Sequence, residues 1–311
     1  MISVALCTYN GEKYIRQQLD SILAQTMPVD EFVIHDDCST DSTYRILNDY
    51  ANRFPQIKVS RNDFNVGFVK NFENALVECQ GDYIFFSDQD DIWMKDKVAL
   101  TVNYLKKTGM FGAFSNGHLI DENGKKINCT LFSVQNLVPY IERGLLDRYI
   151  FEILCLKGNF VTGAALTITK SAKKLVLPFR TSKYILHDMW IGLSLSSKHK
   201  LGYIDKPLIS YRIHSEQECG LNMESSMRRE FLLEAFAGGG NCRDLMERRR
   251  GSAAIVYYCK LNKDSQRILY RMYSNLFFCS LKNSSNKIKD KILYYFNELY
   301  ARANAKFGFR V

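Results

Sequence analysis

Two patterns alternate along the first hundred residues: short runs of apolar residues, and longer segments in which apolar residues are spaced among polar ones. Between short apolar runs, apolar residues recur every three or four positions, as in Ile15, Leu19 and Ile22, and predict three helices. The order β-α-β-α-β-α-β predicts an α/β fold with a doubly wound, mostly parallel sheet and right-handed crossovers. The apolar runs that predict its strands are 3–10, 31–37, 57–62 and 81–88.

Three of these predicted strands end in polar clusters. In a parallel sheet the carboxyl ends of the strands share one edge, and ligands bind there. Further polar segments follow much later in the chain, so we expect one site built from distant parts of the sequence. The clusters are "CTYN" (7–10), "HDD" (35–37) and "SDQDD" (87–91), and the later segments are 158–168, 185–195 and 208–217.

The densest cluster places three carboxylates, Asp88, Asp90 and Asp91, within four positions. They repel one another at neutral pH unless a cation lies among them. Oxygen ligands suit Mg²⁺ or Mn²⁺, and Mg²⁺ usually shares its shell between a few carboxylates, phosphate oxygens and water. The cluster therefore indicates a metal site that receives a diphosphate. The alternative is a solvated acidic turn ahead of a helix predicted over 93–106.

Other residues at the strand ends fit the nucleotide of such a diphosphate. A strand-end Asp binds a ribose or the N–H of a base, although it also serves to cap the next helix. Gly67 allows a tight turn, and Lys70 is placed to meet phosphate unless it is an ordinary surface charge. The candidate nucleotide-binding residues are Thr8, Tyr9, Asn10, Asp36, Asp37, Asn65, Gly67, Lys70 and Asn71.

The composition is that of a globular protein, with 46% hydrophobic and 24% charged residues. We find no run of about 18 uncharged apolar residues, so no membrane-spanning helix is predicted. The start "MISVALCTYN" is too short and too soon polar for a signal peptide, so we expect a cytoplasmic protein. Nine cysteines without CxxC spacing indicate reduced thiols and argue against a disulfide framework or structural zinc.

The net charge of +9 belongs to the last quarter of the chain. Residues 1–227 carry 25 Lys and Arg against 26 Asp and Glu, whereas residues 228–311 carry 17 against 7. Two helical stripes, around 268–276 and 292–303, predict a basic, aromatic-rich helical region over 224–311. Residues 1–223 would then form a separate α/β domain.

Four segments in this order and spacing resemble the inverting family 2 glycosyltransferases, which have the GT-A fold. They are "VALCTYNGEKYIRQQLDSILAQT", "EFVIHDDCSTDST", "NVGFVKNFENAL" and "GDYIFFSDQDDIW", and the resemblance extends to about residue 215. The form "DQDDIW" is similar to that of bacterial rhamnosyltransferases. The resemblance implies a catalytic domain over 1–223, with a nucleotide-sugar-binding half (1–110) and an acceptor-side half (111–223). It also implies that Asp37 binds the base and that Asp88, Gln89 and Asp90 stand at the DxD motif, with Asp90 as main metal ligand.

Later motifs extend the resemblance. Asp188, followed by Met189-Trp190, takes the position of the catalytic base, while His187 departs from the acidic residue often found there. "YRIHSEQ" (211–217) resembles the Tyr-Arg-x-His motif with which the family's domain ends. This motif would bring His214 to the metal or diphosphate, and Arg212 could help. The alternative is that His214 is a buried, hydrogen-bonded histidine. "VTGAA" (161–165) matches the segment under the donor sugar and acceptor. The acceptor-side residues implied are Asp91, Trp93, Thr162, Gly163, His187 and Trp190.

The resemblance implies a metal-dependent, inverting transfer of a sugar from a nucleotide-diphosphate donor to a glycan or lipid-linked acceptor in polysaccharide synthesis. dTDP-rhamnose is the first candidate donor, and UDP-hexoses stay open. A nucleotidyltransferase is the alternative enzyme, but it would carry a Gly-rich loop where this chain has "CTYNGEKY". A degenerate carbohydrate- or membrane-binding module would lack the DxD motif or the late Asp, and both are present.

The basic region 228–311 predicts binding to an anionic membrane surface at the inner face of the cell membrane. The alternative is that its stripes pack on the catalytic domain, and no nucleic-acid-reading motif occurs among its charges. Each basic residue near such a surface contributes about 1 kcal/mol. We expect the protein to sediment with anionic liposomes, less so at high salt, and to lose this binding when 228–311 are removed. Binding that ignores salt would contradict the prediction.

Overall fold

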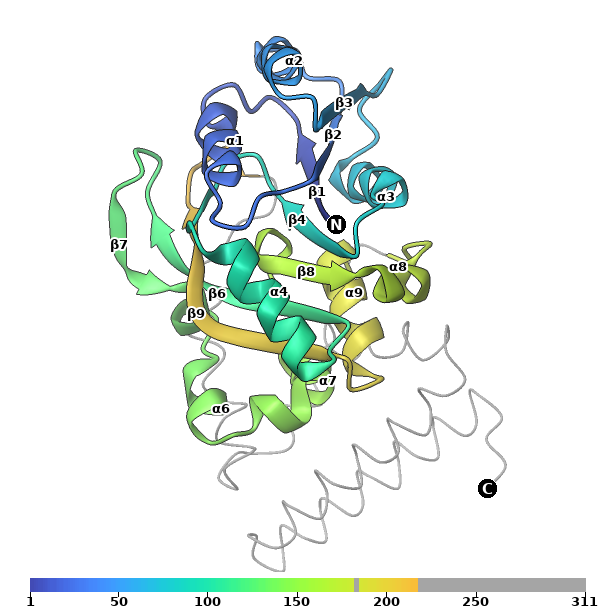
Figure 1. Ribbon diagram of the computed structural model, residues 1–311. Coiled ribbons are helices and arrows are strands. Elements are labelled where there is room, and N and C mark those ends of the chain that lie inside the picture. Colours follow the sequence, from blue (N-terminus) through green and yellow to red (C-terminus); the bar gives the residue numbers. More distant parts are fainter. Residues whose placement is uncertain (182–184, 218–311) are drawn as a thin grey trace, which may run out of the picture. The chain divides into compact units, whose positions relative to one another are not determined.

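The computed structural model describes residues 1–181 and 185–217 (Figure 1). In this part of the chain the strands form one sheet of order β3-β2-β1-β4-β8-β6-β9-β5, with β7 paired to β6. The strands are β1 (Ile2–Thr8), β2 (Glu31–Asp36), β3 (Ile57–Arg61), β4 (Tyr83–Ser87), β5 (Ile92–Trp93), β6 (Gly112–Ile120), β7 (Lys126–Thr130), β8 (Leu166–Thr169) and β9 (Leu201–Arg212). The helices are α1 (Ile15–Leu23), α2 (Thr43–Arg53), α3 (Phe68–Glu78), α4 (Lys97–Thr108), α5 (Leu131–Val134), α6 (Val138–Glu142), α7 (Leu146–Lys157), the 3-10 helix η1 (Gly163–Ala165), α8 (Lys170–Val176) and α9 (His187–Ser196).

The first four strands form the parallel arrangement that the sequence predicts. β1 lies between β2 and β4, β3 lies outside β2, and all three pairs are parallel. Every residue of β1 and β2 is buried, as in parallel sheets covered on both faces, which explains their nearly continuous apolar runs. The strands β1, β2 and β3 follow one another toward one edge of the sheet, and β4 is then added on the other side of β1. Right-handed crossovers therefore put α1 and α2 on one face of the sheet and α3 on the other.

Beyond β4 the sheet is mixed, so the expectation of a mostly parallel sheet holds only for its first part. β8 runs antiparallel to both β4 and β6, β9 runs parallel to β6, and β5 pairs antiparallel with β9. The apolar pattern of a strand reads the same in both directions, so it does not reveal strand direction. An α/β sheet extended by antiparallel strands is a common arrangement.

Strand β9 brings distant parts of the chain together at the candidate site. Its register against β6 shifts twice around Asn116, and such irregularities let a strand bend, as the long curved β9 in Figure 1 shows. The end of β9 then pairs with β5, with Ile92 opposite Ser210. As a result, the acidic cluster before β5 lies beside the segment that follows Ser210, more than a hundred residues later.

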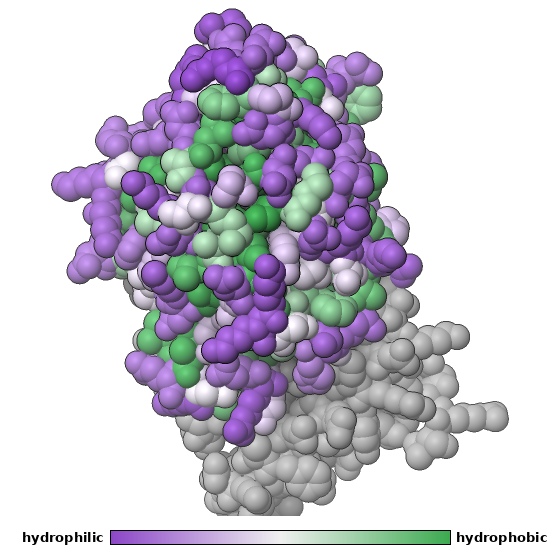
Figure 2. Space-filling model, in the orientation of Figure 1, coloured by the Kyte–Doolittle hydropathy of each residue, from purple (hydrophilic) through white to green (hydrophobic). Residues whose placement is uncertain are grey.

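The surface of the described part is mainly polar. Figure 2 shows hydrophilic residues over most of the viewed face, with hydrophobic residues in small groups between them. None of the helices in residues 1–181 and 185–217 is both long and apolar enough to cross a membrane. Cys7, Cys38, Cys79 and Cys129 are free thiols. The predicted helical region 224–311 and its boundary lie outside the described residues.

Candidate active site

The loops that follow β1 and β2 are joined through Asn10. This residue has φ +48°, a left-handed conformation that Asn tolerates, and its Oδ1 accepts a hydrogen bond from the N–H of Thr40 at 2.8 Å. Its own N–H donates to Oγ of Ser39 at 2.9 Å, and the N–H of Gly11 donates to Oγ1 of Thr43 at 2.7 Å. Asn10 therefore holds two loops at the strand ends together.

Asp36 is buried and connects the end of β1 with the loop after β2. Its side chain is fully buried; Oδ1 accepts from Oγ1 of Thr8 at 2.9 Å and also from Oγ of Ser39, and Oδ2 lies 3.4 Å from Nε of Arg61. The N–H of Ser39 donates to the same Oδ2. These contacts engage both oxygens inside the protein. The structure thus gives Asp36, and Thr8 with it, a structural role in place of the predicted donor contact.

Asp37 fixes the loop that leads into α3. Its Oδ1 accepts from the N–H of Val66 at 2.8 Å and from Nδ2 of Asn62, and its Oδ2 accepts from the N–H of Gly67 at 2.9 Å. Gly67 has φ +83°, which explains the glycine at this turn, and Oδ1 of Asn65 also accepts from its N–H. Asp37 therefore shapes the edge of the sheet where the sequence predicts the nucleotide.

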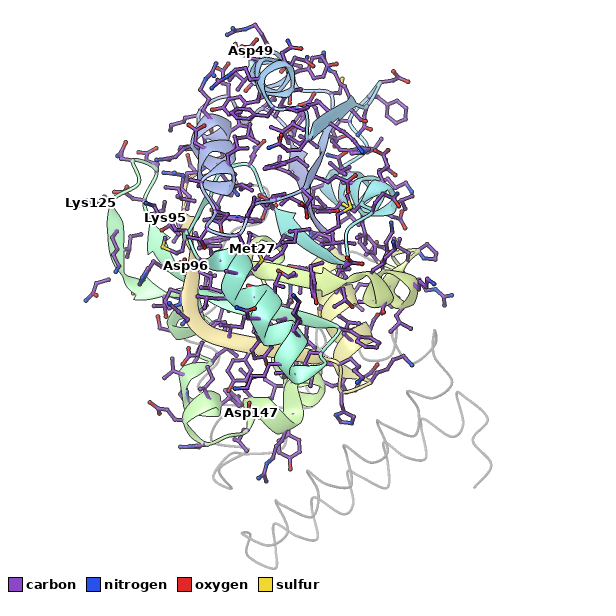
Figure 3. All side chains as sticks on the ribbon, viewed as in Figure 1. Met27, Asp49, Lys95, Asp96, Lys125 and Asp147 are labelled. Carbon is purple, nitrogen blue, oxygen red and sulfur yellow. The ribbon has the colours of Figure 1, made fainter. Side chains whose placement is uncertain are left out.

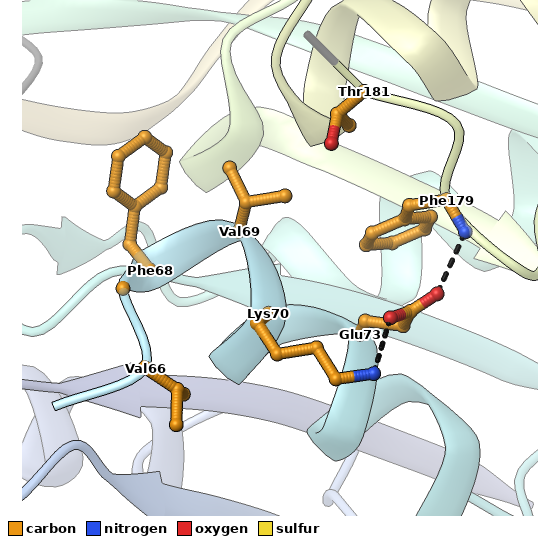
Figure 4. Close-up of a pocket in the computed structure, with 8 residues that line it drawn as sticks. Val66, Phe68, Val69, Lys70, Glu73, Phe179 and Thr181 are labelled. Carbon is orange, nitrogen blue, oxygen red and sulfur yellow. Dashed lines mark hydrogen bonds and ion pairs between the residues drawn. The ribbon is translucent and has the colours of Figure 1, made fainter. Parts of the chain in front are cut away.

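Asn71 and Lys70, which follow on α3, take different positions. Asn71 is buried, and its Nδ2 donates to the carbonyl of His35 at 2.8 Å, so it serves the fold rather than contacting a donor. Lys70 is exposed, and its Nζ lies 2.6 Å from Oε2 of Glu73. Figure 4 shows this ion pair at a pocket of about 240 Å³, where Oε1 of Glu73 accepts from the N–H of Phe179.

Asp90 and His214 meet at the end of the sheet. Nε2 of His214 lies 2.8 Å from Oδ2 of Asp90, and these side chains are 7% and 13% exposed. Nδ1 of His214 is buried without a hydrogen-bond partner among the described residues. The pairing of β5 with β9 brings the two together, as the sequence predicts for a site built from distant segments.

Asp88 extends this pair toward α9. Burial, followed by the negative charges of Asp90 and Asp188, raises the pKa of the Asp88 carboxyl to about 8. Asp188 lies in the first turn of α9, where its Oδ1 accepts from the N–H of Met189 at 2.7 Å. The loop after β4 and the start of α9 thus bring three negative charges within electrostatic reach of one another. Their mutual repulsion marks the place where a cation would be stabilised.

The residues fit a divalent ion that is shared with a ligand. In residues 1–181 and 185–217, no three His, Cys, Asp or Glu side chains stand close enough to hold a metal ion by themselves. Mg²⁺ usually needs only one or two protein carboxylates, and Asp88 and Asp90 could supply them. An imidazole is a less usual ligand for Mg²⁺ or Mn²⁺. The contact of His214 with Asp90 also orients that carboxylate.

Gln89 connects the acidic loop to the loop after β1. Its Oε1 accepts from the N–H of Tyr9, and its Nε2 donates to the carbonyl of Tyr9, both at 2.9 Å. A Cβ on Gly11 would collide with the Gln89 amide, so a larger residue there would displace the Gln89 side chain. The Tyr9 side chain is 38% exposed beside this junction. Gln89 therefore fixes the position of the acidic loop through backbone groups.

Arg212 has a different role from the predicted one. It is 1% exposed, and its Nε donates to the carbonyl of Asp90 at 2.7 Å. Nη1 donates to the carbonyls of Asp121 and Glu122, and Nη2 donates to Oε1 of Gln17 at 2.6 Å. These carbonyls belong to the β6–β7 turn, where Figure 3 labels Lys125. The guanidinium thus binds three parts of the chain and positions the acidic loop.

Asp91 and Trp93 lie behind the acidic loop. Asp91 is 1% exposed, and its Oδ1 accepts from the N–H of Arg212 at 2.9 Å. Trp93 is 3% exposed, and its ring centroid lies 5.5 Å from that of Phe85. Both side chains are buried in this structure, and the acceptor-side role stays a prediction for them.

The other acceptor-side candidates are partly brought together. A Cβ on Gly163 would lie 3.0 Å from Nε2 of His187 and 3.8 Å from Cβ of Asp188, so the glycine lets η1 approach the start of α9. Thr162, next to it, accepts from Nε2 of Gln135 at 3.0 Å. Trp190 departs from the prediction, because it is buried and its Nε1 donates to the carbonyl of Val176.

His187 occupies an aromatic cage. Its ring stacks on Phe72 with a centroid distance of 4.5 Å, and Phe68, Phe86 and Phe179 surround it at 5.9 to 6.3 Å. Burial lowers the pKa of its imidazole, against the opposing charge of Asp188. A neutral imidazole therefore stands beside Asp188 where an acidic residue is often found in the resembled family.

Comparison with known proteins now adds to this geometry. The family model described as Glycosyl transferase family 2 matches residues 3–174, more than half of the chain. The chain belongs to this family. The glycosyltransferase is 31% identical over 235 residues to the dTDP-rhamnosyl transferase RfbG of Shigella flexneri, covering 70% of this chain and 74% of that protein. These matches set aside the nucleotidyltransferase and the non-catalytic module.

Other relatives match part of the glycosyltransferase. It is 31% identical to the putative teichuronic acid biosynthesis glycosyltransferase TuaG of Bacillus subtilis, over 44% of this chain and 54% of that protein. Among solved structures, S. aureus TarS 1-349 in complex with UDP-GlcNAc matches with a TM-score of 0.54 and 21% identity, over 76% of this chain and 66% of that one. This likeness confirms the predicted GT-A fold.

Three residues of the glycosyltransferase's site escaped prediction. Neither Gly11 nor Gln17 belongs to a polar cluster at a strand end. Gly11 has a role because the Gln89 side chain lies against it, and Gln17 has one because Arg212 donates a hydrogen bond to it. Lys97, the first residue of α4, is 1% exposed, although a lysine ahead of a helix normally indicates surface. The single glycine in "CTYNGEKY" was the available signal for Gly11.

We expect Arg212→Met to destabilise the glycosyltransferase by about 3 kcal/mol, since it leaves carbonyls of Asp90 and the β6–β7 turn without their buried donor. Urea denaturation measures this. Arg45→Met is the matched control. Arg45 is largely exposed on α2 beside Asp49, and Figure 3 labels Asp49. The loss of Arg45 should lower the free energy of unfolding by at most about 0.5 kcal/mol. Equal losses in the two variants would contradict the bracing role of Arg212.

Proposed function

We propose that this glycosyltransferase moves a sugar, with inversion and with a divalent metal, from a nucleoside-diphosphate donor to a glycan acceptor in cell-surface polysaccharide synthesis. The observation that carries the proposal is the convergence of Asp88, Asp90 and His214 with Asp188 at the carboxyl end of the sheet. A diphosphate held at the first group would present its sugar to the second. The relatives RfbG and TuaG support the polysaccharide setting.

A dTDP-linked rhamnose is the donor we propose first. RfbG, the relative named as a dTDP-rhamnosyl transferase, supports this choice, together with the motif "DQDDIW". A UDP-linked hexose is the second candidate, and the acceptor would be a glycan or a lipid-linked saccharide. Asp37 and the loop it holds at Gly67 would bind the base and ribose, with Tyr9 beside them.

Asp90 and Asp88, with His214 beside them, would hold Mg²⁺ or Mn²⁺. The bound ion supplies Lewis-acid stabilisation of the charge that grows on the departing diphosphate. The protein's part is to aim the carboxylates: Arg212 fixes the backbone of Asp90, and His214 fixes its Oδ2. Gln89 ties the same loop to Tyr9. The ligands are therefore held in place before a donor arrives.

Asp188 would take the proton of the attacking acceptor hydroxyl. One of its oxygens is occupied by the N–H of Met189, and Oδ2 accepts no hydrogen bond from the described residues. A general base on the side opposite to the leaving diphosphate gives inversion, as in inverting glycosidases. The neutral His187 next to it adds no second negative charge at this point.

Asp90→Asn should abolish transfer of rhamnose from dTDP-rhamnose while the fold is kept, because it weakens the metal site at a strand end. The measurement is release of dTDP in an acceptor assay with Mn²⁺ titrated from zero, with thermal unfolding as a check on folding. EDTA should inhibit the wild type in the same way. Full activity in EDTA would contradict the proposed role of the metal. Activity with UDP-hexoses but not with dTDP-rhamnose would contradict the proposed donor.

Asp188→Asn should retain dTDP binding and lose about a hundredfold or more in kcat, as loss of a general base does. Calorimetry of dTDP binding and the transfer rate separate the two effects. Asp205→Asn, which changes an exposed carboxylate on β9, serves as the control and should leave the rate unchanged. Near-normal turnover by Asp188→Asn would place the base elsewhere.

A further inference from the structure

The His187 ring packs beside the strand that leads into the acidic loop. Its centroid lies 6.3 Å from that of Phe86 on β4, two residues before Asp88. It also stacks on Phe72 of α3 at 4.5 Å with an interplanar angle of 23°, and the Phe72 and Phe86 centroids are 5.9 Å apart. The three buried rings therefore pack on one another, and the residue that carries one of them directly precedes Asp188.

The same ring also packs against the start of α3, next to the loop where we propose that the nucleotide binds. Phe68, the first residue of α3, meets the His187 ring edge-on at 5.9 Å. It directly follows Gly67, whose N–H donates to Oδ2 of Asp37 at 2.9 Å. The start of α3 is thus joined to the loop after β2 by hydrogen bonds and to His187 by ring packing.

Two further segments define the place of the imidazole. The ring of Phe179 stacks toward it at 6.3 Å, and the N–H of Phe179 donates to Oε1 of Glu73 on α3 at 2.7 Å, as Figure 4 shows. On η1, Gly163 leaves room for the ring, since a Cβ there would lie 3.0 Å from Nε2 of His187. The imidazole therefore packs against α3, β4, η1 and the segment that contains Phe179.

Ring packing, and not hydrogen bonding, holds this histidine. The side chain is 6% exposed, and in residues 1–181 and 185–217 neither Nδ1 nor Nε2 has a hydrogen-bond partner. Buried polar atoms are normally hydrogen-bonded, and leaving them unpaired costs free energy. The aromatic neighbours of His187 must therefore offset this cost, and they do so by fixing the ring in a closely packed position.

We propose that His187 is a positioning residue whose ring, held by Phe72 and Phe86, sets the position of Asp188 relative to the acidic loop. The inference rests on the proposed function, since it takes Asp188 as the base and the acidic loop as the place of the metal and diphosphate. The loop before α3 keeps its hydrogen bonds to Asp37 when the His187 ring is removed. A change at His187 therefore lowers the rate of transfer more than the affinity for the nucleotide.

The test begins with His187→Leu, which replaces the flat ring by a branched side chain of similar size. We expect kcat to fall about 100-fold, as a misplacement of about 1 Å can cause. The Kd of dTDP with Mn²⁺, measured by calorimetry, should change less than about threefold, because the lost interaction acts on the transition state. A wild-type kcat, or a loss of dTDP binding as large as the loss in kcat, would contradict the proposal.

Phe114→Leu is the matched control for the loss of a buried ring. Phe114 is 1% exposed and packs on Phe132 at 5.7 Å, in a second aromatic cluster that contains no candidate site residue. It should lower the melting temperature about as much as Phe72→Leu, which removes the stacking partner of His187. Only Phe72→Leu should also lower kcat, so this variant tests the proposal if His187→Leu does not fold. Equal kcat values in the two phenylalanine variants would refute it.

His187→Gln separates the ring from its nitrogen atoms. The amide of Gln can take the place of Nε2, but Gln has no flat ring to stack on Phe72. We expect this variant to be as slow as His187→Leu. A wild-type kcat in His187→Gln would mean that a polar atom and not the ring is needed, and the proposal would then be wrong.

A double variant distinguishes this inference from the proposed function. If His187 acts through Asp188, His187→Leu with Asp188→Asn should be no slower than Asp188→Asn alone, because the carboxylate that the ring positions is gone. Losses that multiply in the double variant would overturn the inference and leave the base in place. Near-normal turnover by Asp188→Asn would instead overturn the base of the proposed function.

Discussion

A buried guanidinium next to an acidic loop is the interaction on which the rest of this site depends. The side chain of Arg212 donates to backbone carbonyls and to Gln17, and its N–H donates to Asp91. It therefore joins β9, α1, the β6–β7 turn and the loop after β4. Without this side chain, the carbonyls of Asp90, Asp121 and Glu122 would lose their hydrogen-bond donor, and the connection between these loops would be lost.

The same constraint explains why so many conspicuous polar residues point inward. Asp36, Asn71 and Asp91 are all buried and hydrogen-bonded to strand ends or loops, so they support the groups that remain at the surface of the site. Buried polar groups are retained only where partners satisfy them. In this candidate site, a few exposed side chains are thus held in place by a larger number of buried polar side chains. A preorganised catalytic centre requires such support.

Family and fold belong together in this glycosyltransferase, whereas substrate identity rests on finer features. The family match covers residues 3–174, and the fold match to TarS shows only how the chain is arranged. Residues 66–73 meet Phe179 at the pocket of Figure 4, beside the aromatic cage of His187. Glu73 and Phe179, which are joined by a hydrogen bond there, lie 106 residues apart in the sequence.

The sequence by itself determined the parallel strands β1 to β4 and the acidic loop that follows β4. It also predicted a site at the carboxyl ends of these strands, with His214 and Asp188 as partners of that loop. Apolar periodicity and strand-end polarity are local signals, so they can be read without a structure. Only the tertiary structure decided strand direction beyond β4 and the inward roles of Arg212, Trp93, Trp190 and Lys97. A side chain's type does not say which way it points, because bends such as that in β9 and distant partners settle this.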